Sequence, residues 1–161
     1  AQHLAGALFE ERTGVRLSHI PYRGGGPAMN DVMGGQVPLF FANVASSLGH
    51  IQSGKLRALA VTAPVRARSL PDVPTMAEAG VPNVEVTSWQ AIVAPKGLPP
   101  AVREKAHAAF AEALNSPKVK DQFTSIGFEM VVNTPAEFAA FQQKEYARWK
   151  QVIETGKISI D

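Results

Sequence analysis

Cysteine is absent from the 161 residues. Disulfide frameworks, thiolate metal sites and cysteine nucleophiles are therefore excluded. Long apolar runs are missing as well, because none approaches the roughly 20 residues that a membrane-spanning helix needs. We therefore do not expect the chain to be embedded in a membrane.

Acidic residues are scarce in one part of the chain. The formal net charge of +2 is too balanced to favour nucleic acid as a partner, despite the pI of 9.1. Between residues 12 and 71, however, Asp31 is the only acid, and that stretch carries a net +6. This distribution favours small anions as partners, although a scattered basic surface that serves solubility would give the same pattern. The basic residues are Arg12, Arg16, Arg23, Lys55, Arg57, Arg66 and Arg68.

Catalytic and metal-binding motifs are also lacking. The four histidines lie far apart without ligand spacing. Ser46 and Ser47 stand in ASSLG rather than in a GxSxG elbow, so helix capping is the better interpretation of them. GGGPAMND lacks the third glycine of GxGxxG and the lysine of a P-loop. We predict no catalytic residues, no metal site and no cofactor.

The first half of the chain alternates between two periodicities. Leu4, Leu8 and Phe9 recur at helical spacing before Gly14, which is placed to end a helix. Apolar runs that are typical of strands then alternate with short helical segments, and this order predicts a mainly parallel α/β sheet. The expected strands are 15–20, 37–42 and 56–62, and the expected helices are 27–33 and 44–53.

The second half is predicted to be mostly helical. Thr75 and Glu78 form a capping-box pattern before a short helix closed by Gly80. Thr134 and Glu137 repeat that pattern before the last helix. The expected helices are 100–114, 116–126 and 135–155, and the expected extended segments are 84–94 and 128–132.

Three consecutive glycines stand between an extended segment and a helix start in HIPYRGGGPAMND. A helix beginning at Pro27 would leave the backbone N–H groups of Gly25, Gly26, Ala28 and Met29 free to bind an anion. The loop 43–46, after the apolar run LFFA, is expected at the same edge of the sheet. The two loops would converge on one carboxylate, and the alternative is a flexible turn without a ligand.

Several motifs together resemble one protein family. HLAGALFEERTGV, HIPYRGGGPAMNDVMGGQV, IQSGKLRALAVT followed by Arg66, LPDVPTMAEAG and SWQAIVAPKGLP occur in the order and spacing of Bug-type extracytoplasmic solute receptors of tripartite tricarboxylate transporters. The resemblance extends to the closing KISID. It implies a periplasmic, type II binding-protein α/β fold, no enzymatic activity, and two lobes that close over a small carboxylate and deliver it to membrane permease subunits.

The resemblance also implies how the chain is organised. Residues 1–86 match the second, ligand-binding lobe, and residues 87–161 match the hinge crossing and the C-terminal helical part of an incomplete first lobe. Family members begin with a secretion signal and an N-terminal stretch, so we expect that the sequence starts inside a larger chain. The apolar stripes of the last helices are then expected to be covered by an oligomer or by a second segment. They include Phe110, Phe123, Phe138, Phe141 and Trp149.

Site residues follow from the matching motif. PYRGGGP places Tyr22, Arg23, Gly24, Gly25, Gly26 and Pro27 near the ligand carboxylate, together with Ala28, Asn43 and Ser46. For Arg23, a distal carboxylate and plain solvation are both open interpretations.

The remaining matches bear on the solute and on the hinge. Where family members commonly show an acid after phenylalanine, this chain has Ala42 and Asn43, which favours a di- or tricarboxylate or an aromatic acid over a solute with an amino group. Trp89 is either a cleft wall at the crossing or plain packing, and His3 matches a position near the cleft. Two other functions stay open, namely a protein interaction module and an enzyme that acts on small anions.

Overall fold

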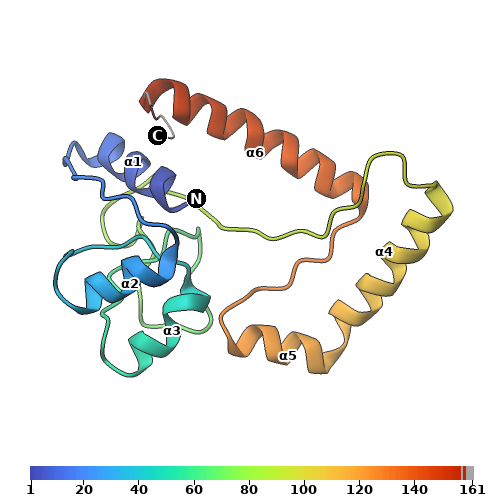
Figure 1. Cartoon of the computed structure of the whole chain (residues 1–161), viewed down its shortest axis with the longest axis horizontal. Coiled ribbons are helices and arrows are strands. Elements are labelled where there is room, and N and C mark those ends of the chain that lie inside the picture. The colour runs from blue at the N-terminus through green and yellow to red at the C-terminus, as the bar shows by residue number, and fades with distance from the viewer. Residues whose placement is uncertain (157, 159–161) are drawn as a thin grey trace.

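The computed structural model describes residues 1–156 and 158. The first three helices gather with their connecting segments at one end of the molecule, α4 and α5 stand apart at the other end, and α6 returns over α1 (Figure 1). Of the closing KISID, only residue 158 lies within the described part. The helices are α1 (Gln2–Thr13), α2 (Gly25–Met33), α3 (Val44–Gln52), α4 (Pro100–Asn115), α5 (Pro117–Ser125) and α6 (Pro135–Gly156).

The helix boundaries follow local signals in the sequence. Helix α1 ends at Gly14, which adopts φ 72° and donates its amide to the Glu10 carbonyl at 2.9 Å. Pro117 opens α5 and Pro135 opens α6, as expected for a residue whose missing N–H costs a helix start nothing. The main shift is in α2, which begins at Gly25, two residues before the expected Pro27.

The expected strands are not formed in the described residues. Segments 15–20, 37–42, 56–62, 84–94 and 128–132 run without a ladder, and the one β contact is an isolated parallel bridge between Val61 and Thr75. Val61 exchanges backbone hydrogen bonds with the loop at Pro74 and Met76, at 2.8 and 2.9 Å. An apolar run predicts extended backbone, but a strand also needs a neighbour in register to pair its N–H and C=O groups. The predicted parallel sheet is therefore not confirmed.

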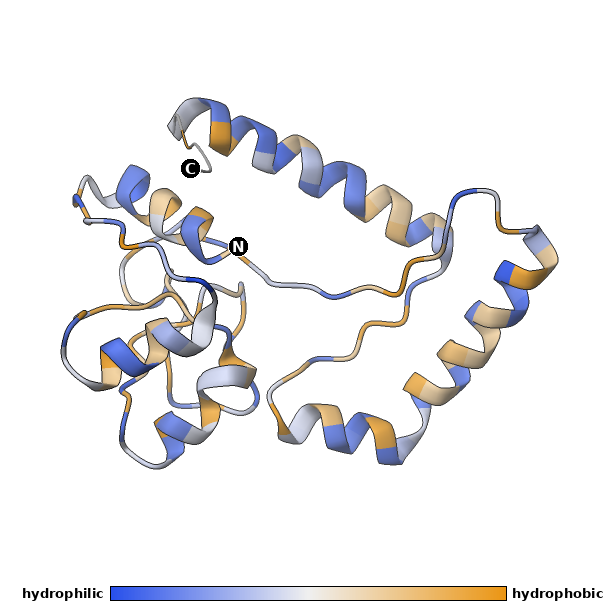
Figure 2. Cartoon of the chain, in the orientation of Figure 1, coloured by the Kyte–Doolittle hydropathy of each residue, from blue (hydrophilic) through white to orange (hydrophobic). Residues whose placement is uncertain are grey.

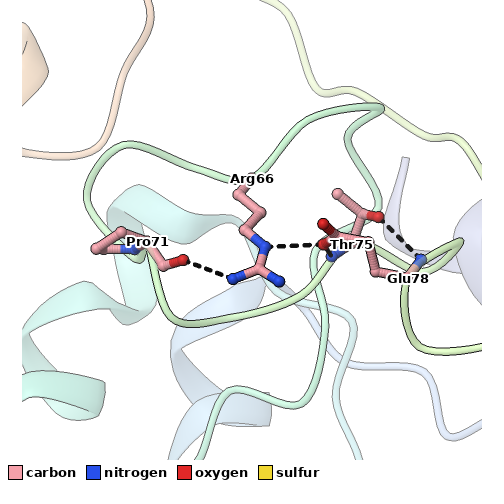
Figure 3. Close-up of polar contacts among 4 residues, drawn as sticks. All are labelled: Arg66, Pro71, Thr75 and Glu78. Atoms are coloured by element: carbon pink, nitrogen blue, oxygen red, sulfur yellow. Dashed lines mark hydrogen bonds and ion pairs between the residues drawn. The ribbon is translucent and has the colours of Figure 1, made fainter.

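The short helix expected after Thr75 is a single turn. The capping box itself forms, since the Glu78 carboxylate accepts the Thr75 amide at 2.8 Å and Thr75 Oγ1 accepts the Glu78 amide at 3.1 Å. Gly80 then adopts φ 88°, which ends the turn before a helix propagates. Arg66 reaches across this turn, donating to the Glu78 carboxylate at 2.8 Å and to the Pro71 carbonyl at 3.0 Å (Figure 3).

One small core joins the two ends of the chain. Ala5 and Leu8 of α1 are buried against Val84 and Val86. Trp149 and Val152 of α6 pack on the same cluster, together with Phe9, Phe41, Met76 and Val81. This cluster lies where α1 and α6 come together, on the side away from α4 and α5 (Figure 1).

The outer helices expose much of their apolar surface. No residue of α4, α5 or α6 is buried among the described residues, and Figure 2 shows hydrophobic positions along α4 and α6. Phe110 and Phe141 are exposed in the single chain, whereas Phe123, Phe138 and Trp149 are half-buried because they pack against other aromatic or core residues. Each helix of residues 1–156 is too short or too polar to cross a lipid bilayer.

Candidate functional site

The glycine loop ends in an uncapped helix. Gly24 is the N-cap of α2 and has φ 118° and ψ 171°, a conformation that residues other than glycine rarely adopt. No side chain caps the helix. A Cβ atom placed on Gly24, Gly25 or Gly26 would meet nothing within 4 Å. A ligand could therefore approach the backbone of all three residues directly.

The early start of α2 changes which amides can bind an anion. The N-cap and the first three residues of a helix have no intrahelical acceptor, so these N–H groups belong to Gly24, Gly25 and Gly26, while Pro27 has none. Ala28 and Met29, whose amides we expected to be free, follow in the first turn with buried side chains. The candidate donors are therefore the three glycines.

Tyr22 ties the loop to α2. Its hydroxyl donates to the Asp31 carboxylate at 2.7 Å, and this hydrogen bond raises the pKa of Tyr22 because removing the phenol proton would leave two anions side by side. Asp31 is the one acid of the basic stretch. Neighbouring Arg23 is exposed and forms no ion pair with the described residues. The hydrogen bond from Tyr22 thus anchors the start of the glycine loop to α2, and Arg23 stays exposed beside the loop.

Asn43 is the N-cap of α3 but does not cap it. Its backbone is extended (φ −75°, ψ 136°), as in a normal N-cap, yet its side chain makes no capping bond. Instead, Asn43 Oδ1 accepts a hydrogen bond from the Ser88 hydroxyl at 2.9 Å. The hydroxyls of Ser46 and Ser47 each donate to the Asn43 carbonyl at 2.9 Å, so the interpretation of these serines as caps was wrong. They bond back onto a carbonyl, as serine does inside a helix turn.

Two later segments come close to this region. A Cβ on Gly127 would lie 3.2 Å from Val44 Cγ1 and 3.5 Å from the Ala45 backbone, and Gly127 has φ 86°. Glycine is therefore required where the chain returns from α5 past the start of α3. Trp89 stacks edge-on against Phe138 and Phe141, with ring centroids 5.6 and 5.7 Å away, and keeps 43% of its surface exposed.

Known proteins resemble this chain over nearly its whole length. A family model described as "Tripartite tricarboxylate transporter family receptor", TctC, matches residues 1–158. The chain belongs to this family. Protein BugT of Bordetella pertussis (strain Tohama I) is 41% identical over 155 residues, which are 96% of this chain and 48% of BugT. The chain spans about half the length of most of the curated relatives it matches.

Solved structures agree with the family assignment. A Rhodopseudomonas palustris protein solved with adipate has a TM-score of 0.91 at 34% identity, covering 98% of this chain and 53% of that protein. Periplasmic binding protein BugD has a TM-score of 0.88 at 35% identity, covering 99% and 54%. MatC from R. palustris, with bound malate, has a TM-score of 0.81 at 29% identity, covering 95% and 53%. The expected likeness to Bug-type periplasmic binding proteins is confirmed. The relatives of this chain are solute-binding receptors rather than enzymes.

Two features of this TctC-family chain were missed by sequence reasoning. The pairing of Ser88 with Asn43 spans 45 residues, and nothing in the SWQ motif indicates it. The imidazoles of His3 and His19 stack with centroids 4.0 Å apart and planes 8° apart. Burial, aided by the neighbouring His19, lowers the pKa of His3. These rings stack face to face, and no cluster of three metal-ligating side chains occurs in the described part of the chain.

Proposed function

We propose that this chain forms the solute-gripping part of an extracytoplasmic receptor. It captures a small carboxylate in the periplasm and delivers it to the membrane permease subunits of a tripartite tricarboxylate transporter. One observation carries the proposal: the N-terminus of α2 is uncapped and open at Gly24, Gly25 and Gly26. Family membership and the adipate and malate bound by two solved relatives support the class of solute.

The binding chemistry follows from the start of α2. Three backbone N–H groups and the positive end of a nine-residue helix face the same small region. A carboxylate there accepts hydrogen bonds that are worth about 1.5 to 3 kcal/mol each when the acceptor is charged. Glycine is suited to these positions because a side chain would hold the carboxylate away from the backbone.

Charge around the loop favours an anion over a cation. The basic stretch contains one acid, Asp31, which is already bonded to the Tyr22 hydroxyl. Ala42 follows Phe41 where the family resemblance leads us to expect an acid, so no carboxylate at that position attracts a substrate amino group. We propose a plain di- or tricarboxylate, or an aromatic acid, as the solute, with Arg23 and Ser46 at the periphery of the site.

The two-lobe division is part of the same proposal. Residues 1–86 form the ligand-binding lobe, and residues 87–161 form the hinge crossing and the C-terminal part of the other lobe. The extended segment after Val86 supports this division, since it leaves the small core and runs to α4 without burying a side chain (Figure 1). Trp89 lies at the start of that crossing, packed on α6.

The test replaces a glycine whose side-chain space is open. In the full-length protein, Gly25→Val is expected to weaken the binding of adipate or malate by at least about 30-fold, because the branched side chain covers amides that contribute roughly 2 kcal/mol or more. Calorimetry measures the affinity, and far-UV circular dichroism is expected to stay unchanged because a Cβ at Gly25 meets nothing within 4 Å.

Gly49→Val is the matched control. Gly49 is also a helical glycine with open space around its Cβ, but it lies in α3 away from the helix start. The control is expected to bind like the wild type. Equal affinities for wild type and Gly25→Val would contradict the proposed site, and failure of the wild type to bind any member of a carboxylate panel would contradict the proposed function.

A further inference from the structure

Asn43 is the N-cap residue of α3, but its side chain makes no hydrogen bond to the first turn of the helix. Asparagine is among the best N-cap residues because its side-chain oxygen accepts an amide of the first turn. Here the oxygen accepts the Ser88 hydroxyl instead, at 2.9 Å. A strong local preference has been overridden by a contact with a segment 45 residues away.

Ser88 is held in place from both sides. Two residues earlier, the Val86 amide donates to the Thr62 carbonyl at 2.9 Å, and the Thr62 hydroxyl donates to the Val86 carbonyl at 2.7 Å. The next residue, Trp89, packs edge-on against Phe138 of α6. The Ser88 hydroxyl is therefore presented to Asn43 by a fixed backbone rather than by a loose loop.

The bond also occupies one end of the Asn43 amide. An amide side chain carries an acceptor oxygen and a donor NH₂ group on the same carbon. Because the oxygen is engaged by Ser88, the NH₂ group is the part of this exposed side chain that is left to bind a ligand. Asn43 thus offers two donor hydrogens at a position that belongs to the proposed site.

We infer that Ser88 is a positioning residue for solute recognition. It holds Asn43 so that Nδ2 donates to a carboxylate oxygen of the solute, and it thereby selects solutes that present acceptors over solutes that present donors. This inference rests on the proposed function and adds to it a role for the crossing segment. Both residues are exposed, so the bond contributes little to stability and its main consequence is orientation.

The test uses the full-length protein with adipate as the probe. Ser88→Ala is expected to weaken adipate binding by about 5- to 10-fold, because the freed Asn43 amide must be ordered on binding. Ser88→Thr keeps the hydroxyl and is expected to restore the affinity. The melting temperature of Ser88→Ala is expected within about 2 °C of the wild type. Ser125→Ala, at a serine whose hydroxyl bonds only within α5, is the matched control and is expected to bind like the wild type.

A double-mutant cycle separates positioning from direct contact. Asn43→Ala is expected to weaken adipate binding, and adding Ser88→Ala is expected to cause no further loss. The Asn43 side-chain NH₂ signal in a ¹H–¹⁵N spectrum is expected to shift on adding adipate in the wild type and to shift less in Ser88→Ala.

Each contrary outcome has a distinct meaning. If Ser88→Ala weakens binding equally in both backgrounds, Ser88 touches the solute itself and the positioning role is overturned. The role is also overturned if adipate binds and Ser88→Ala has no effect. If Gly25→Val abolishes binding while both changes at Ser88 and Asn43 are silent, the proposed function stands and only this inference is lost. If neither adipate nor any other carboxylate of the panel binds, both are lost.

Discussion

At the scale of single residues, the Glu78 carboxylate holds together the loop of residues 66–78. Glu78 Oε2 accepts both the Thr75 amide and the Arg66 guanidinium at 2.8 Å (Figure 3). These hydrogen bonds, that of Arg66 foremost, lower the pKa of Glu78 below its ordinary value of 4.5. The ionised carboxylate of Glu78 therefore stabilises the folded state, and protonation of Glu78 removes this contribution to the free energy of unfolding.

The lowered pKa of Glu78 predicts a pH-dependent stability. The contribution is complete above about pH 4.5 and is lost as the pH falls through the lower pKa of the folded state. We expect Glu78→Gln to reduce the melting temperature at pH 7 by no more than about 3 °C, since the pair is exposed, and we expect this difference to shrink as the pH falls below 4.5. Thermal unfolding at a series of pH values measures it. A difference that stays constant from pH 7 to pH 3 would show that Glu78 acts without its charge.

At the scale of helices, two similar starts are built differently. Thr134 and Ser116 each precede a proline that opens a helix. Thr134 Oγ1 accepts the Glu137 amide at 3.2 Å, and the Glu137 carboxylate accepts the Thr134 amide at 2.8 Å, which is a complete capping box. The Ser116 hydroxyl instead donates back to the Ala113 carbonyl at 2.7 Å, so α5 has no side-chain cap.

This difference predicts unequal costs of removing the two hydroxyls. Thr134→Ala is expected to lower the free energy of unfolding by about 1 kcal/mol, because the Glu137 amide loses its acceptor. Ser116→Ala is the matched comparison and is expected to cost less than about half as much, since it removes no cap. Urea unfolding followed by circular dichroism measures both. Equal losses would mean that the Thr134 hydroxyl, as a cap, contributes no more to stability than the non-capping hydroxyl of Ser116.

At the scale of the whole molecule, the chain is unusually open. Its accessible surface is 11695 Å², whereas a compact monomer of its mass, 17.2 kDa, exposes roughly 7,800 Å². Much of the difference comes from α4, α5 and α6, which bury no residue among those described. Val102 and Phe110 on α4 are about half exposed, at 50% and 47%. Apolar surface on this scale favours association.

We expect the isolated 161 residues to associate in solution. Light scattering should report a mass above the 17.2 kDa of one chain, because covering apolar surface is worth about 25 cal/mol per Å². The double substitution Val102→Glu with Phe110→Glu is expected to shift the chain toward the monomer. Gln122→Glu with Gln143→Glu adds the same charge at exposed polar positions and should leave the mass unchanged. A monodisperse wild-type monomer with ordered helices would contradict this expectation.

The helices could be predicted from the sequence alone because their causes are local. Gly14 ends α1, and the Thr134–Glu137 pair starts α6, through groups within four residues of one another. Family membership was predictable for a related reason, since the motifs that carry it are contiguous, and the match over residues 1–158 confirms it. The glycine loop was found because a run of three glycines before a helix is costly without a purpose.

The tertiary structure alone decided what each segment pairs with. Apolar runs indicated strands, but a β-ladder needs a neighbouring strand in register. Among the described residues, Val61 forms only an isolated bridge with Thr75. The sequence favoured Asn43 and Ser46 near a ligand, yet only folding brought Ser88 to the Asn43 oxygen. Likewise, α1 and α6 share a core through Leu8 and Trp149 although they lie at opposite ends of the chain. Pairing over such separations depends on the path of the whole backbone, and no local preference encodes that path.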